Sequence, residues 1–128
     1  TAWIPLGLVG QSTAGAQLLA GEQWHFRAMV YGVAMLGLGI PLAIYAISKH
    51  WGAALGSTPM SYNPTWRAST FPVGTCCLGT HTLSTQPAAL ALGMGWMDTI
   101  SAALLVLLLV HVMWATIGAA VIGWIKAR

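Results

Sequence analysis

The feature that most constrains this chain is the spacing of its charged residues. Five Lys and Arg residues and two Asp and Glu residues are the only charged ones among 128. A soluble domain of this length usually carries several times more charge. The charges leave four uncharged runs, at 1–21, 28–48, 68–97 and 99–125. Each run is long enough for the roughly 20 residues that a membrane-spanning helix needs.

These runs predict an all-α integral membrane protein. Lipid offers no hydrogen-bond partner to backbone N–H and C=O groups, whereas a helix satisfies them internally. With 57% of its residues hydrophobic, the chain has too few polar residues for the outer face of a helical bundle in water. We therefore expect one membrane domain over 1–128 in a lipid bilayer. Its four transmembrane helices are predicted at about 3–20, 28–48, 68–86 and 98–125.

The basic residues predict the orientation of these helices. When the four runs are threaded back and forth across a membrane, Arg27 falls on one side and the other four basic residues fall on the opposite side. Those four are Lys49, Arg67, Lys126 and Arg128. Because basic residues concentrate on the cytoplasmic side of membrane proteins, we expect a cytoplasmic C-terminus in the plasma membrane.

Several classes of function find no support in the sequence. The net charge of +3 comes without a stripe of basic and aromatic residues, so nucleic-acid binding is not expected. Neither a Ser-His-Asp arrangement nor paired carboxylates are present, which argues against a hydrolase. The adjacent Cys76 and Cys77 are interpreted as small apolar helix residues. Cys77 and His81 form an i, i+4 pair that supplies only two metal ligands. We expect no enzyme activity, cofactor or metal.

The four predicted helices differ in composition. The first and third are rich in Gly, Ser, Thr, Gln and Pro, whereas the second and fourth are dominated by apolar residues. Polar side chains that face hydrocarbon lack partners, so we expect the first and third helices to lie inside a bundle or beside a wet cavity. On the third helix, one face is expected to hold Phe71, Thr75, Leu78, Thr82 and Thr85. From spacing alone, this face is either a packing seam or the wall of a conduit.

Two segments resemble a known family. The stretch YNPTWRASTFPVGTCCLGTHTLS resembles the penultimate helix of the tellurite-resistance/dicarboxylate transporter family. That family includes TehA-like channels, malate permeases, sulfite efflux pumps and slow-type anion channels. The earlier stretch PLGLVGQSTAGAQLL is similar to the same family's Leu-Gly-Pro-x-Gly-Gln-Ser segment, which lies two helices before. The two motifs have the family's order and spacing.

The resemblance implies an architecture and a function. The architecture is a ten-helix protein with five inner helices around a pore and five outer helices, assembled as a homotrimer. This chain would then supply helices seven to ten. The implied cargo is small anions such as chloride, nitrate, sulfite, tellurite or a C4-dicarboxylate such as malate.

The resemblance also assigns roles to particular residues. It implies that Phe71 is an aromatic pore gate and that Pro72 kinks the pore helix. A dry aromatic constriction raises the barrier for a hydrated ion. Further pore-lining residues would be Gln11, Thr75, Thr82 and Arg67. The sequence departs from the family at Arg67, which replaces the second Trp of a Trp-Trp pair, and at Leu8, which replaces the Pro of a Gly-Pro. Arg67 would either draw anions to the pore or extend to lipid headgroups.

Three alternatives stay open. No carboxylate lies within the four runs, which favours passive conduction, but a proton-coupled anion carrier of the same family could use His81. A different class is a haem-binding bundle in which His81 and His111 ligate one haem. The third alternative is a structural membrane subunit.

Overall fold

The structure, a computed structural model, describes residues 3–54 and 68–127, and every regular element in these ranges is a helix. The four longer helices are α1 (Ile4–Leu19), α2 (His25–Ala54), α3 (Thr70–Ser84) and α5 (Met97–Lys126). Shorter elements are α4 (Pro87–Ala91) and the 3₁₀ turns η1 (Glu22–Trp24) and η3 (Met94–Trp96). The predicted all-helical class is confirmed for the described residues.

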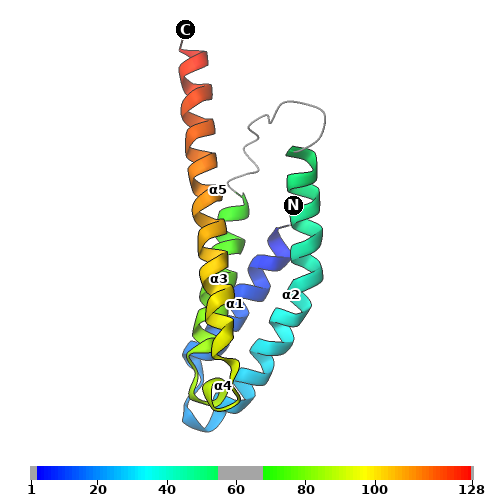
Figure 1. Cartoon of the computed structure of the whole chain (residues 1–128), viewed down its shortest axis with the longest axis vertical. Helices are drawn as coiled ribbons and strands as arrows, with labels where there is room; N and C mark the ends of the chain where they lie inside the picture. Colours follow the sequence, from blue (N-terminus) through cyan, green and yellow to red (C-terminus); the bar gives the residue numbers. More distant parts are fainter. Residues whose placement is uncertain (1–2, 55–67, 128) are drawn as a thin grey trace.

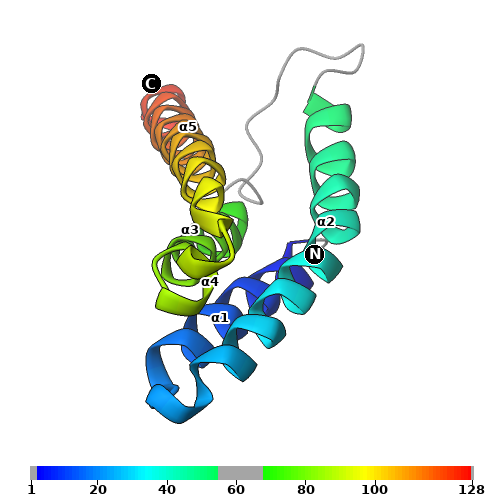
Figure 2. The same ribbon diagram turned by 60° about the horizontal axis from the view of Figure 1, so that its bottom comes forward.

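The long helices α2 and α5 flank the shorter α1 and α3 (Figure 1). The most extensive packing joins α1 to α3, followed by α3 to α5 and α1 to α2. Figure 2 shows α2 and α5 leaning apart, with α1 beside α2 and α3 beside α5. The helix α3 therefore contacts α1, α2 and α5.

Two helical segments are long and apolar enough to cross a membrane. They are Glu22–Lys49, which contains most of α2, and Met94–Lys126, which contains α5. The helices α1 and α3 have 16 and 15 residues, fewer than the roughly 20 that a straight crossing needs. The structure thus supports two of the four predicted spans by length and composition, and α2 continues through Pro41.

Glycines allow α1 and α3 to approach very closely. A Cβ atom at Gly10 would lie 2.4 Å from the backbone nitrogen of Cys76, and a Cβ at Gly79 would lie 2.8 Å from the Gly10 carbonyl oxygen. Neither position has room for a side chain. Small residues at such crossings are typical of helix packing in membranes, where close backbone contact replaces the hydrophobic effect.

Hydrogen bonds between helices reinforce this packing. The Thr75 hydroxyl donates to the Gly7 carbonyl at 3.2 Å, and the Gln86 amide donates to the Gln17 carbonyl at 3.2 Å. The Gln17 amide in turn donates to the Ala28 carbonyl of α2 at 2.6 Å. The polar residues of α1 and α3 thus serve partly to join helices.

A buried histidine, His111, lies between α5 and two tryptophans of the first half of the chain. His111 of α5 is fully buried, and its ring makes edge-to-face contacts with Trp3 and Trp51 at centroid distances of 5.8 and 5.6 Å. Its Nδ1 donates to the Leu107 carbonyl at 2.8 Å. His111 of α5 therefore packs against Trp3, which directly precedes α1, and against Trp51 of α2.

Candidate transport surface on α1 and α3

One face of α1 and α3 is turned away from α2 and is exposed in this chain. On α1 the exposed positions include Leu8 and Gln11, and on α3 they include Phe71 and Leu78, with Thr85 directly after its last residue. The opposite side of α1 contacts α2, where Val9 and Thr13 lie near glycines of that helix. We call the surface formed by these five exposed residues the α1–α3 face.

Phe71 lies where the two helices of this face meet. It is 61% exposed, and a Cβ atom at Gly7 would lie 3.5 Å from two carbons of its ring. The ring therefore lies against α1 at Gly7, within ordinary packing distance of a Cβ atom placed there. The adjacent Pro72 is buried, and a Cβ atom at Gly7 would lie 3.4 Å from its Cγ. An exposed aromatic side chain thus lies at the seam between α1 and α3, beside Gly7.

Pro72 is the third residue of α3. In the first turn of a helix, backbone N–H groups have no partner within the helix, so a proline there removes no hydrogen bond. The bend expected at Pro72 stays a prediction.

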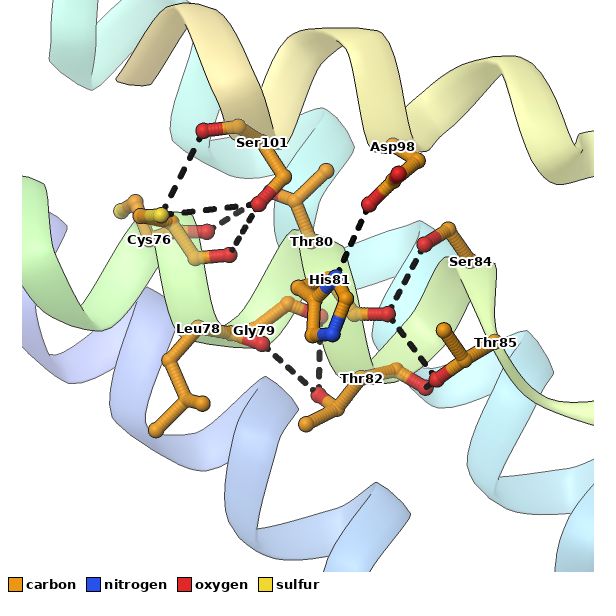
Figure 3. Close-up of polar contacts among 11 residues, drawn as sticks. Cys76, Leu78, Gly79, Thr80, His81, Thr82, Ser84, Thr85, Asp98 and Ser101 are labelled. Carbon is orange, nitrogen blue, oxygen red and sulfur yellow. Dashed lines mark hydrogen bonds and ion pairs between the residues drawn. The ribbon is translucent and has the colours of Figure 1, made fainter. Parts of the chain in front are cut away.

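The threonines of α3 are less open than the sequence pattern suggested. Thr75 is half-buried, and besides the bond to Gly7 its hydroxyl lies 3.0 Å from the Pro72 carbonyl. Thr82 is 9% exposed, and its hydroxyl donates within its own helix to the carbonyls of Leu78 at 3.0 Å and Gly79 at 3.1 Å (Figure 3). Both hydroxyl protons are therefore already engaged.

The remaining predicted lining residues have different positions. Gln11 is exposed on α1, within the α1–α3 face. Arg67 lies outside the described residues. Gln11 and Phe71 therefore lie on the α1–α3 face, and Thr75 lies at its edge. Thr82 is nearly covered.

The side of α3 that meets α5 carries polar contacts that the sequence analysis did not pair. The Cys77 thiol donates to the Ser101 carbonyl at 3.3 Å, and the Ser101 hydroxyl donates to the Cys77 carbonyl at 3.0 Å. One turn further on, His81 Nδ1 lies 2.8 Å from Asp98 Oδ1. The signal for this ion pair was available, because His81 and Asp98 lie near the adjoining ends of consecutive antiparallel helices.

These contacts bear on the metal and haem alternatives. Within the ranges 3–54 and 68–127, no group of three or more His, Cys, Asp or Glu residues could hold a metal. His81 contacts Asp98 near the start of α5. His111 lies 13 positions beyond Asp98 on that helix, or about 20 Å at 1.5 Å per residue. Two imidazoles so far apart cannot ligate one haem iron, so the geometry does not support that alternative.

An apolar groove on the other side of α3 has the wrong chemistry for an anion. It has a volume of about 360 Å³ and lies between α2 and α5, with Leu36, Ile40 and Met97 among its lining residues. Its polar lining residue Thr80 donates its hydroxyl to the Cys76 carbonyl at 2.7 Å. Among the residues named as its lining, none is charged, so the α1–α3 face is the better candidate.

The described part of the chain is all-helical, with two shorter helices that expose small, polar and aromatic residues beside two long helices that are apolar enough to cross a membrane. A comparison with known families identifies it further. Residues 1–120 match the family model SLAC1, described as voltage-dependent anion channel. The chain belongs to this family, and the sequence-based assignment to the transporter family that contains the slow-type anion channels is confirmed.

Family membership indicates a membrane protein with a general role in anion transport, since members are channels and transporters rather than enzymes. No curated protein and no solved structure matches the chain.

Proposed function

We propose that this chain forms part of a membrane pathway for small anions, in which the ring of Phe71 is the constriction. The observation that carries the proposal is the position of Phe71. In a chain of the voltage-dependent anion channel family, this large aromatic side chain is 61% exposed and rests over Gly7 at the seam of two small-residue helices. An apolar ring in a narrow pore raises the barrier to an ion that must shed water.

The charge distribution suits an anion that is conducted rather than bound tightly. Neither α1 nor α3 contains an Asp, Glu, Lys or Arg residue, so no fixed charge would trap or repel an anion near Phe71. We propose that pore width, the Gln11 amide and the weakly positive charge of the chain select the cargo. The proposed cargo is chloride, nitrate, sulfite, tellurite or a C4-dicarboxylate such as malate.

The proposed assembly follows the family resemblance. The helices α1 and α3 would be two of five inner helices of a ten-helix bundle, and α2 and α5 two of five outer ones. The exposure of α2 and α5, of which few residues are buried, supports an outer position. We propose a homotrimer in the plasma membrane with a cytoplasmic C-terminus. In that assembly Arg67 and Thr82 would border the pathway, and Pro72 would set the position of the Phe71 ring.

Current through a planar bilayer tests the proposal. The full-length protein that contains these residues is compared with its Phe71→Ala variant. Phe26→Ala serves as a matched control, because Phe26 is 62% exposed on α2, away from the α1–α3 face. We expect Phe71→Ala to raise chloride or nitrate current roughly tenfold or more, since about 1.4 kcal/mol removed from a barrier raises a rate tenfold. Phe26→Ala should leave the current unchanged.

A flat current in all three proteins would contradict the proposed gate. If radiolabelled sulfite or malate still crossed vesicles along a proton gradient, the protein would be a coupled carrier and Phe71 a packing residue. The current and flux measurements together therefore separate a channel from a carrier.

A further inference from the structure

The ion pair between His81 and Asp98 is the feature that the proposed pathway does not yet use. His81 Nδ1 and Asp98 Oδ1 are 2.8 Å apart, and the two side chains are 55% and 61% exposed. Figure 3 shows the His81 ring reaching from α3 to the first turn of α5. An exposed pair of this kind adds little to stability.

The pair borders the α1–α3 face near one end of the bundle. On α3 the exposed residues Phe71, Leu78 and His81 follow i, i+7 and i+10 spacing, which keeps them within about a quarter turn of one another on a helix. His81 lies ten residues beyond Phe71, about 15 Å along the axis. An anion that passes along this face would meet the pair before or after the Phe71 ring.

Few other titratable groups surround His81. The helices and turns α1, α4 and η3, which pack on α3, contain none. On α5, Asp98 faces His81, while His111 and Lys126 lie about 20 and 40 Å further along that helix at 1.5 Å per residue. On α3 itself, the Cys77 thiol is engaged with Ser101.

The helix α2 and the turn η1 place three more titratable groups toward the same end of the bundle. The His25 Nε2 donates to the Ala20 carbonyl at 3.1 Å, and Arg27 lies 4.6 Å from the Trp24 ring centroid. Glu22 is exposed in η1. Among the residues that the structure describes, the carboxylate in ion-pair distance of His81 is that of Asp98. The other titratable residues of α2 are Tyr31, Tyr45, Lys49 and His50.

We propose that His81 and Asp98 form a proton-binding site that sets the charge at one mouth of the anion pathway. This inference rests on the proposed anion transport. With His81 protonated, the pair has no net charge. When His81 releases its proton, Asp98 is left as one uncompensated negative charge. Histidine is the side chain that can gain or lose a proton near neutral pH, and loss of the His81 proton would make the mouth negative and repel anions.

The expected effect is moderate and has a definite sign. A unit charge at a pore mouth, screened over a Debye length of about 8 Å, changes the local anion concentration and hence the current by about two- to threefold. Anion current should therefore fall about two- to threefold as the pH on the side of the pair rises from 5.5 to 8. Changing the pH on the opposite side should have no such effect.

Four proteins test this site, all in the Phe71→Ala background so that current is measurable. The background protein switches the pair between charges of zero and −1. His81→Gln fixes the charge at −1 and should give a low, pH-independent current, equal to that of the background at pH 8. The double variant His81→Gln with Asp98→Asn fixes the charge at zero and should give the high current at every pH. Asp98→Asn alone switches between +1 and zero and should exceed the background at both extremes.

A matched control and the sign of the effects distinguish this site from a structural tether. His25 lies at the same end of the bundle, but its partner is a backbone carbonyl rather than a carboxylate. The His25→Gln variant should therefore keep the full pH response. If the pair merely tied α3 to α5, the two single substitutions would change the current in the same direction. The proposed site requires opposite directions.

The outcomes also separate this inference from the proposed function. Anion current that persists in the background protein but falls equally with pH in His81→Gln would overturn the site and leave the pathway standing. Absence of anion current from the background protein at every pH would overturn the pathway, and the proton site with it.

Discussion

Replacing Gly10 by alanine should loosen the contact between α1 and α3 more than any other single methyl group added to α1. The new Cβ would lie 2.4 Å from the Cys76 nitrogen, 2.5 Å from the Thr75 carbonyl carbon and 2.8 Å from the Cys76 Cα. All three are backbone atoms, which cannot rotate away. The two helices must separate by about 1 Å before the nearest contact reaches the 3.4 Å of ordinary packing.

The size of the effect follows from this displacement. A gap of about 0.5–1 Å forfeits a quarter to a half of the dispersion energy of each affected contact, and overpacked cores are typically destabilised by about 1–3 kcal/mol. We expect Gly10→Ala to lie near the upper end of that range. At about 3 kcal/mol, the corresponding fall in melting temperature is roughly 6–12 °C for a protein of about 150–250 residues.

Gly15→Ala is the matched control for this prediction. Gly15 lies on the same helix, and a Cβ atom there meets nothing within 4 Å in this chain. Thermal unfolding of the detergent-solubilised full-length protein, followed by tryptophan fluorescence, provides the measurement. Equal melting temperatures for Gly10→Ala and Gly15→Ala would refute the close approach of α1 and α3.

Two further substitutions test single contacts between helices. Thr75→Val removes the hydroxyl that donates to the Gly7 carbonyl and should lower the free energy of unfolding by about 0.5–1.5 kcal/mol. Thr75→Ser keeps a hydroxyl and should retain most of this stability. Equal losses in the two variants would show that the hydroxyl does not contribute. Ser101→Ala removes the hydroxyl bound to the Cys77 carbonyl and should lower thermal stability by about 0.6 kcal/mol. Its control is Ser12→Ala, since the Ser12 hydroxyl bonds within its own helix, and the prediction is wrong if both serine variants melt alike.

The class of fold was predictable because it depends on composition over long runs. Charge-free runs around Glu22, Arg27 and Asp98 require helices, whichever way each helix is rotated. The same reasoning could not give the exact ends of α1 and α3, because local backbone geometry and packing determine where each helix stops. Pro87 begins the short α4, directly after residue 86, where the third helix was predicted to end.

The details of the candidate surface depend on helix rotation, which composition does not specify. Gly10 and Gly15 look alike in the sequence GLVGQSTAG, yet only Gly10 lies at the crossing with α3. Thr82 shares a face with Phe71 by spacing, but the adjoining helices nearly cover it. His81 and Asp98 lie near the adjoining ends of the third and fourth predicted helices, so their proximity could be anticipated, but contact between their side chains depends on how α3 and α5 are rotated.

The ion selectivity of the current through the Phe71→Ala variant is the most direct test of the central claim, that this chain contributes to a pathway for anions. In a planar bilayer with a KCl gradient, the reversal potential reports which ion carries the current. We predict a reversal potential close to the chloride equilibrium potential. A reversal potential close to that of potassium would contradict the account.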